Sequence, residues 1–333
     1  MTTYAVGRAA FRVAWFVALV LAFGEFPSHA QILDQVNTAP IRSANLPHIA
    51  GEELRTHSRP LTVDVDLVLV PATVTDGFNH PVTTLQKRDF HLFEENTEQD
   101  IRYFAEEDAP ISIGILLDTS GSMSMKYELA RQALDEFFVN SNHDDDYFVI
   151  TYSNRPKLLA DTTQSVNDIE DELAEVVPDG STPLLDAIYL GLSKLKQARY
   201  ERRALLIISD GGDNHSRYRA KEIREMVQES DVQIYSMGIF GALNITLEDH
   251  QGKKLLRDIS EATGGRAEFF TSPAKLPETA ARFSRELRNQ YVLGYRPRTL
   301  QRDGKLHKVT VKVVEQITRP LQVSYKRQYL AAR

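Results

Sequence analysis

The residues best suited to chemistry follow an apolar run in the middle of the chain. In ILLDTSGSMS, residues 115–124, Asp118, Ser120 and Ser122 form the pattern D-x-S-x-S. Thr182 stands in DGSTP just before an apolar helical pattern, and Asp210 ends the run LLIISD. Together they offer two carboxylates and three hydroxyls. These hard oxygen donors suit Mg²⁺ or Mn²⁺ in octahedral geometry.

Each of these elements also has a structural explanation when it is taken alone. Ser122 or Ser124 would cap a helix that begins near Met125, and Thr182 would cap the next one. The glycines after Asp210 indicate a turn. However, all the elements are expected at one edge of one sheet, where open α/β sheets place their ligand sites. Their coincidence favours a metal site with an open position for an external carboxylate.

The elements that must position these residues alternate between strand and helix. Strands are predicted over 111–118, 146–153, 204–210, 232–239 and 266–270. A helix is predicted over 183–196 with Pro183 at its start, and the last helix runs from about 274 to 289. Apolar strands flanked by helices predict a doubly wound, mostly parallel, Rossmann-like α/β domain over 109–290.

The segments before and after this region have a β pattern. Residues 61–108 contain alternating apolar positions and short strand-like runs, and residues 291–333 contain three more such runs. Each segment alone would leave unpaired strand edges and too few strands for a sandwich. We therefore predict that the two segments pair into one small β-sandwich, with the α/β domain inserted between them. Two independent β pieces are the alternative.

The first thirty residues have the features of an export signal. Arg8 and Arg12 precede the apolar run 13–23, and small residues at 28 and 30 suit a cleavage site. An uncleaved anchor is the alternative, but the apolar run is shorter than the ~20 residues that cross a bilayer. We predict a cleaved signal peptide over 1–30 and a linker or arm over 31–60. The mature protein is expected in the periplasm or outside the cell, without a stable membrane span.

Composition excludes several other classes of protein. The formal net charge is −7 over 333 residues, without a basic cluster, so no nucleic-acid partner is expected. The absence of cysteine excludes disulfides, thiol nucleophiles and zinc-thiolate sites. The acidic run Asp144 to Asp146 lacks the calcium-loop pattern and is interpreted as a solvated entry to a strand. Of the nine histidines, His215 is the one expected at the rim of the site.

The elements DTSGSM, STP and SDGGD, in this order, resemble the metal-ion-dependent adhesion site of von Willebrand factor type A domains. The resemblance covers about 109–290 and implies a six-stranded Rossmann-like sheet. It implies a Mg²⁺ or Mn²⁺ ion that binds an acidic residue of a protein partner. The implied ligands are Asp118, Ser120, Ser122, Thr182 and Asp210, the aspartates acting directly or through water. The flanks are similar to a subgroup of exported bacterial proteins, common in acidobacteria.

These patterns lead to a first hypothesis and two alternatives. The first is a non-enzymatic adhesion or assembly module that binds a partner protein through the metal. The second is a Mg²⁺-dependent phosphoesterase using Asp118, although position 120 is Ser where such enzymes typically carry a second aspartate. The third is a structural module in which the metal only stabilises the loops. The absence of G-x-S-x-G disfavours a serine hydrolase.

Overall fold

A computed structural model describes residues 67–210, 212–240, 246–298, 303–314 and 320–331. All of these described residues belong to one compact unit. The predicted signal peptide over 1–30 and the arm over 31–60 lie outside the described residues. Among the described helices, none has the length and apolar character needed to span a membrane.

A six-stranded sheet with the order β10-β9-β8-β5-β6-β7 forms the centre of the α/β domain. Its strands are β5 (Ser112–Asp118), β6 (Asp146–Ser153), β7 (Arg155–Thr163), β8 (Arg203–Ser209), β9 (Val232–Ile239) and β10 (Ala267–Phe270). Neighbouring strands are parallel except for β6 and β7, which are antiparallel. The α/β fold with a mostly parallel sheet, predicted from the sequence, is confirmed.

Strand β7 is the element of this sheet that the sequence patterns do not predict. It lies at the edge of the sheet, it carries Pro156 at its second position, and only Ala160 of its nine residues is buried. An edge strand pairs on one side only and tolerates proline and charge. Its sequence therefore lacks the apolar run by which the central strands were recognised.

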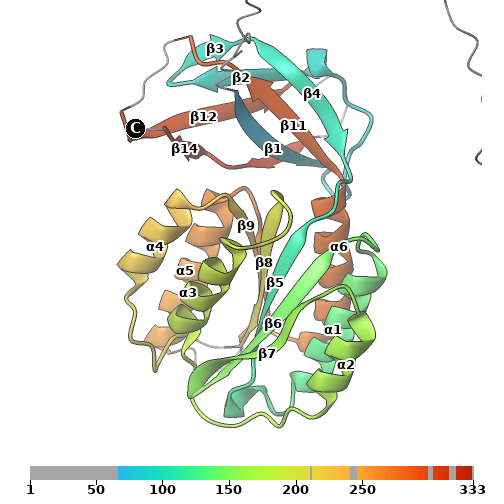
Figure 1. Ribbon diagram of the computed structural model, residues 1–333, viewed down its shortest axis with the longest axis vertical. Coiled ribbons are helices and arrows are strands. Elements are labelled where there is room, and N and C mark those ends of the chain that lie inside the picture. Colours follow the sequence, from blue (N-terminus) through green and yellow to red (C-terminus); the bar gives the residue numbers. More distant parts are fainter. Residues whose placement is uncertain (1–66, 211, 241–245, 299–302, 315–319, 332–333) are drawn as a thin grey trace, which may run out of the picture. The chain divides into compact units, whose positions relative to one another are not determined.

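Helices cover both faces of the central sheet (Figure 1). One face carries α1 (Tyr127–Val139), α2 (Val166–Ala174) and α6 (Leu276–Arg288), and the other carries α3 (Leu184–Leu195), α4 (Ala220–Glu229) and α5 (Leu247–Ala262). Successive side chains of a strand point to opposite faces. Ile115 of β5 accordingly packs with Phe137 and Phe283 in one apolar core, while Leu116 packs with Ile188 in the other.

Two four-stranded sheets, β13-β1-β11-β4 and β14-β12-β2-β3, accompany the α/β domain. Their strands are β1 (Val68–Thr75), β2 (Phe90–Glu94), β3 (Thr97–Gln99), β4 (Ile101–Glu107), β11 (Gln290–Tyr295), β12 (Leu306–Val313), β13 (Gln322–Tyr325) and β14 (Gln328–Leu330). Each sheet combines strands from before and after the α/β domain. Val70 and Tyr291 from one sheet share an apolar core with Leu92 and Val311 from the other.

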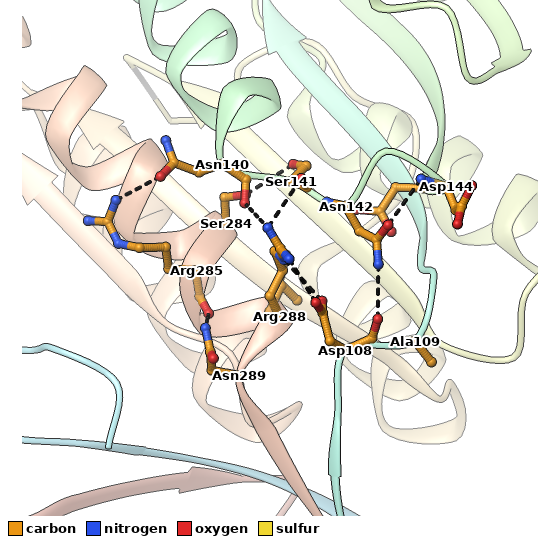
Figure 2. A network of polar contacts seen from close by, with 12 residues as sticks. Asp108, Ala109, Asn140, Ser141, Asn142, Asp144, Ser284, Arg285, Arg288 and Asn289 are labelled. Atoms are coloured by element: carbon orange, nitrogen blue, oxygen red, sulfur yellow. Dashed lines mark hydrogen bonds and ion pairs between the residues drawn. The ribbon is translucent and has the colours of Figure 1, made fainter. Parts of the chain in front are cut away.

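A polar network holds the two linkers that join the α/β domain to these strands (Figure 2). Arg288, the last residue of α6, makes a bidentate contact with Asp108, at 3.0 and 2.7 Å. The guanidinium lowers the pKa of the Asp108 carboxyl. Arg288 also donates to the carbonyl oxygens of Asn140 and Ser141, which follow α1. Since bidentate arginine pairs have a fixed geometry, this network sets where the chain enters β5 and leaves α6.

The acidic run at residues 144–146 differs from the expectation of a solvated strand entry. Asp144 is exposed, but Asp145 and Asp146 are both buried. Asp145 accepts from the backbone N–H of Ile111 at 2.8 Å and of Asn142 at 3.1 Å. Burial raises the pKa of the Asp145 carboxyl. Backbone donors at a buried strand start need acceptors, and a side-chain carboxylate supplies them here.

Candidate metal centre

Asp118 ends the buried strand β5 and is itself fully buried. Its Oδ1 accepts from the backbone N–H of Ser120 at 2.9 Å, and its Oδ2 accepts from Oγ of Ser209 at 2.9 Å. Ser209 is the last residue of β8, the parallel neighbour of β5. The carboxylate is therefore oriented by groups from two adjacent strand ends.

A continuous hydrogen-bonded chain links four of the five predicted ligands. Beyond the contact between Asp118 and the Ser120 N–H, Oγ of Ser120 lies 3.1 Å from Oγ of Ser122. Ser122 in turn donates to Oδ1 of Asp210 at 2.8 Å. Residues 118–122 and Asp210 lie far apart in the sequence, so the parallel pairing of β5 with β8 is what brings them together.

The loop that carries Thr182 lies beside both of these loops. The Gly121 N–H donates to the Gly180 carbonyl at 3.1 Å. The Thr182 N–H donates to Oδ1 of Asn214 at 2.8 Å, and the Asn214 N–H donates back to the Thr182 carbonyl at 3.1 Å. Thr182 is buried. The three predicted loops therefore meet, while the part of the Thr182 hydroxyl as a ligand stays a prediction.

Gly180 is required by the backbone of the Thr182 loop. Its φ is +85°, in the left-handed region, and a Cβ there would lie 2.3 Å from Nδ2 of Asn154. Asn154 also fixes the next residue, because its Oδ1 accepts from the Ser181 N–H at 3.2 Å and its N–H donates to the Ser181 carbonyl at 3.3 Å. The Thr182 loop is thus held from the end of β6 as well.

The capping explanation of these residues is not what the structure shows. Helix α1 begins at Tyr127 after a 3₁₀ turn over Gly121–Met123, and its N-cap is Lys126, which makes no side-chain capping bond. The N-cap of α3 is Pro183 rather than Thr182. The hydroxyls of the first loop instead contact one another and Asp210.

The charge balance of the site favours a cation. Burial, and then the negative charge of Asp210, raises the pKa of Asp118 to about 6. The Asp210 side chain is fully buried and has one cationic neighbour in the described structure, Lys126, whose Nζ lies 2.5 Å from Oδ2. The site therefore holds two buried carboxylates, and the ammonium of Lys126 contacts Asp210. Buried charge without a partner is costly. A divalent cation among hard oxygen donors fits this arrangement.

Within the described ranges, no three or more His, Cys, Asp or Glu side chains gather in a group able to hold a metal ion. The candidate site is of another kind, because it combines two carboxylates with three hydroxyls. Pairs of carboxylates with several neutral oxygens suit Mg²⁺, which usually keeps several of its waters.

Sequence reasoning missed three residues of the site. Ser209 could have been identified from the sequence, because it is a polar residue at the end of the apolar run of β8. Lys126 and Asn214 could not have been identified from the sequence, because their contacts depend on how separate loops meet. His215, next to Asn214, is exposed.

Replacing Asn214 by alanine is expected to weaken Mg²⁺ or Mn²⁺ binding about tenfold. Groups that orient metal ligands are typically worth 10–100-fold in metal affinity. Calorimetric titration with Mn²⁺ measures the effect, and His215→Ala is the matched control because it changes the neighbouring exposed residue. Equal affinities in the two variants would show that Asn214 does not position Thr182 for a metal.

Part of this chain matches known proteins. The family described as the von Willebrand factor type A domain matches residues 113–212. Inter-alpha-trypsin inhibitor heavy chain H3 from Bos taurus is 24% identical over 187 residues, which cover 49% of this chain and 21% of that protein. The protein of the same name from Homo sapiens is 23% identical with the same coverage. The matched region thus spans about a fifth of the length of these relatives.

Two solved structures of low sequence identity are also similar to this chain. A von Willebrand factor type A structure from Catenulispora acidiphila gives a TM-score of 0.47 at 11% identity, covering 73% of this chain and 76% of that one. The PilB minor pilin from Streptococcus sanguinis gives 0.44 at 13% identity, covering 55% and 62%. The family match runs from β5 to just beyond Asp210, so residues 113–212 of this chain match the von Willebrand factor type A domain.

Proposed function

We propose that this protein is a non-enzymatic adhesion or assembly module that binds an acidic residue of a partner protein through a divalent cation. The ligands in this proposal are Asp118, Ser120, Ser122, Thr182 and Asp210, and the cation is Mg²⁺ or Mn²⁺. The observation that carries the proposal is the meeting of three loops at two buried carboxylates, of which Asp210 is paired with an ammonium.

The residues of the proposed site have different roles. Asp118 and Asp210 supply negative charge, and the Ser209 hydroxyl and the Ser120 N–H hold Asp118 in one orientation. The hydroxyls of Ser120 and Ser122 add neutral oxygen ligands. The negative charge of the two carboxylates therefore balances the charge of a divalent cation and does not exceed it. When bound, the cation supplies a positive charge to which a partner carboxylate coordinates.

We also propose that the protein is exported, to the periplasm or the cell exterior. The predicted signal peptide over 1–30 and the similarity of the flanks to exported bacterial proteins, common in acidobacteria, support this proposal. The net charge of −7 supports a protein partner in place of a nucleic acid.

Selection of peptides from a random displayed library tests the proposed function. In a buffer that contains Mg²⁺, the protein is expected to enrich peptides that contain Asp or Glu. EDTA should release these peptides, and replacing their acidic residue by Asn or Gln should abolish binding.

A matched pair of serine variants makes this test specific to the site. Ser122→Ala removes a proposed ligand and should abolish the enrichment. Ser124→Ala removes a nearby hydroxyl that donates to the Gly121 carbonyl, and it should leave the enrichment intact. A cation that raises the melting temperature without any acidic peptide being selected would overturn the binding proposal in favour of a structural metal. Phosphoester turnover lost in Asp118→Asn would overturn it in favour of an enzyme.

A further inference from the structure

Lys126 brings a positive charge of the protein itself into the candidate metal centre. Its Nζ lies 2.5 Å from Oδ2 of Asp210, while the other oxygen of Asp210 accepts from Ser122. The Asp210 side chain is fully buried, and that of Lys126 is 26% exposed. The ammonium therefore occupies an oxygen of Asp210, one of the two charged ligands in the proposed site.

Another ion pair of the same domain shows what is particular about this one. Lys194 lies 2.5 Å from Oδ1 of Asp161, and its side chain is 25% exposed. Asp161, however, is 72% exposed, so water can solvate it when the lysine leaves. The Asp210 side chain is buried and cannot be solvated in this way. When Lys126 leaves Asp210, a buried negative charge remains, and another cation can offset it.

We propose that Lys126 is a built-in competitor for the metal, whose ammonium neutralises Asp210 in the metal-free protein and must leave when a divalent cation binds. The proposal rests on the proposed function, because it concerns the same site. Lys126 is the residue before α1, and it follows the 3₁₀ turn that carries Ser122. Metal binding would thus be coupled to a movement of the Lys126 side chain, while its backbone N–H donates to the Met123 carbonyl at 2.8 Å.

The coupling has a defined sign. Any interaction present only in the metal-free state weakens metal binding by the free energy of that interaction. An exposed ion pair would change the affinity only a few-fold, and a fully buried one by more than about a hundredfold. Since the Asp210 end is buried and the Lys126 end is partly exposed, we expect about a tenfold effect.

Calorimetric titration of the full chain with Mn²⁺ tests the proposal. Lys126→Met, which keeps most of the length of the side chain without its charge, should bind Mn²⁺ about tenfold more tightly than the unaltered protein. Lys126→Arg keeps the charge and should remain close to the unaltered affinity. Lys194→Met, which removes the matched pair outside the site, should leave the affinity unchanged.

Amine labelling gives a second measurement that does not depend on affinity. With the unaltered protein, acetylation of Lys126 followed by mass spectrometry should rise severalfold when Mg²⁺ replaces EDTA, while acetylation of Lys194 should stay constant. Equal or weaker Mn²⁺ binding by Lys126→Met, or labelling of Lys126 that ignores the metal, would overturn the competition and leave the proposed function standing. Failure of the unaltered protein and of Lys126→Met alike to bind Mn²⁺ would overturn the proposed function itself.

Discussion

The Asp118→Asn protein is expected to lose Mg²⁺ and Mn²⁺ binding by at least about a hundredfold, and to be more stable than the unaltered protein in EDTA. The first effect follows from removing one of two charged ligands. The second effect follows from the burial of Asp118. In the absence of a metal ion, burial and the charge of Asp210 make its charged carboxylate unfavourable at neutral pH.

The expected gain in stability has a sign and an approximate size. Burial and the charge of Asp210 raise the pKa of Asp118 from 3.8 to about 6, so above pH 6 the folded protein carries the full cost of the charge. Two pKa units correspond to about 3 kcal/mol. Asparagine has one acceptor oxygen for the two donors that Asp118 serves, which reduces the expected gain to about 1–2 kcal/mol.

Urea unfolding at pH 7.5, in EDTA and in Mg²⁺, measures both effects. The unaltered protein should be stabilised by Mg²⁺, and Asp118→Asn should not respond to it. Asp161→Asn, in which the changed carboxyl is exposed and lies outside the site, should keep the Mg²⁺ response. An Asp118→Asn protein that still responds to Mg²⁺ would remove Asp118 from the ligand set.

The second large effect is a loss of stability with rising pH that depends on Glu286 of α6. The Glu286 side chain is buried, and neither of its carboxylate oxygens has a hydrogen-bond partner in the described structure. The guanidinium Nε atoms of Arg266 and Arg282 lie 3.5 and 4.0 Å from these oxygens. Burial nevertheless dominates, and it raises the pKa of Glu286 from 4.5 to about 7.

The direction of this pH dependence follows from proton binding. Between pH 4.5 and 7 the folded protein holds a proton on Glu286 that the unfolded chain releases, so the free energy of unfolding falls as the pH rises through this window. The shift from 4.5 to about 7 corresponds to about 3 kcal/mol, which is fully lost above pH 7. Asp118 titrates in part of the same pH window. Because Asp118 is present in every protein compared, its contribution cancels.

Urea unfolding of Glu286→Gln at several pH values between 5 and 8, in EDTA, isolates this contribution. The unaltered protein should lose about 2.5 kcal/mol more than Glu286→Gln between pH 5 and 8, because the unfolded glutamate is already mostly ionised at pH 5. Glu278→Gln changes an exposed carboxyl in the first turn of the same helix and should follow the unaltered protein. Parallel curves for all three proteins would show that Glu286 ionises as readily in the fold as in the unfolded chain.

The α/β domain was largely predictable from local patterns. Buried parallel strands leave continuous apolar runs, and residues 146–153 were predicted with the bounds that β6 has in the structure. Strand β7 was not predictable in this way, because an edge strand buries little and its pairing with β6 is decided by the neighbouring strand. The burial of Asp145 was not predictable for a related reason. Asp145 accepts a hydrogen bond from the backbone N–H of Ile111, which lies 34 residues earlier in the chain.

The sequence by itself determined the candidate ligands, because residue types and their positions at strand ends are local properties. The tertiary structure alone decided that Ser122 contacts Asp210 instead of capping α1, that Asn214 holds the Thr182 loop, and that Lys126 neutralises Asp210. These contacts join residues 32 to 88 positions apart. The contacts of Ser122 and Lys126 with Asp210 depend on the parallel pairing of β5 with β8, and the contact of Asn214 depends on how the loop before α3 meets the loop after β8. No short stretch of sequence encodes that geometry.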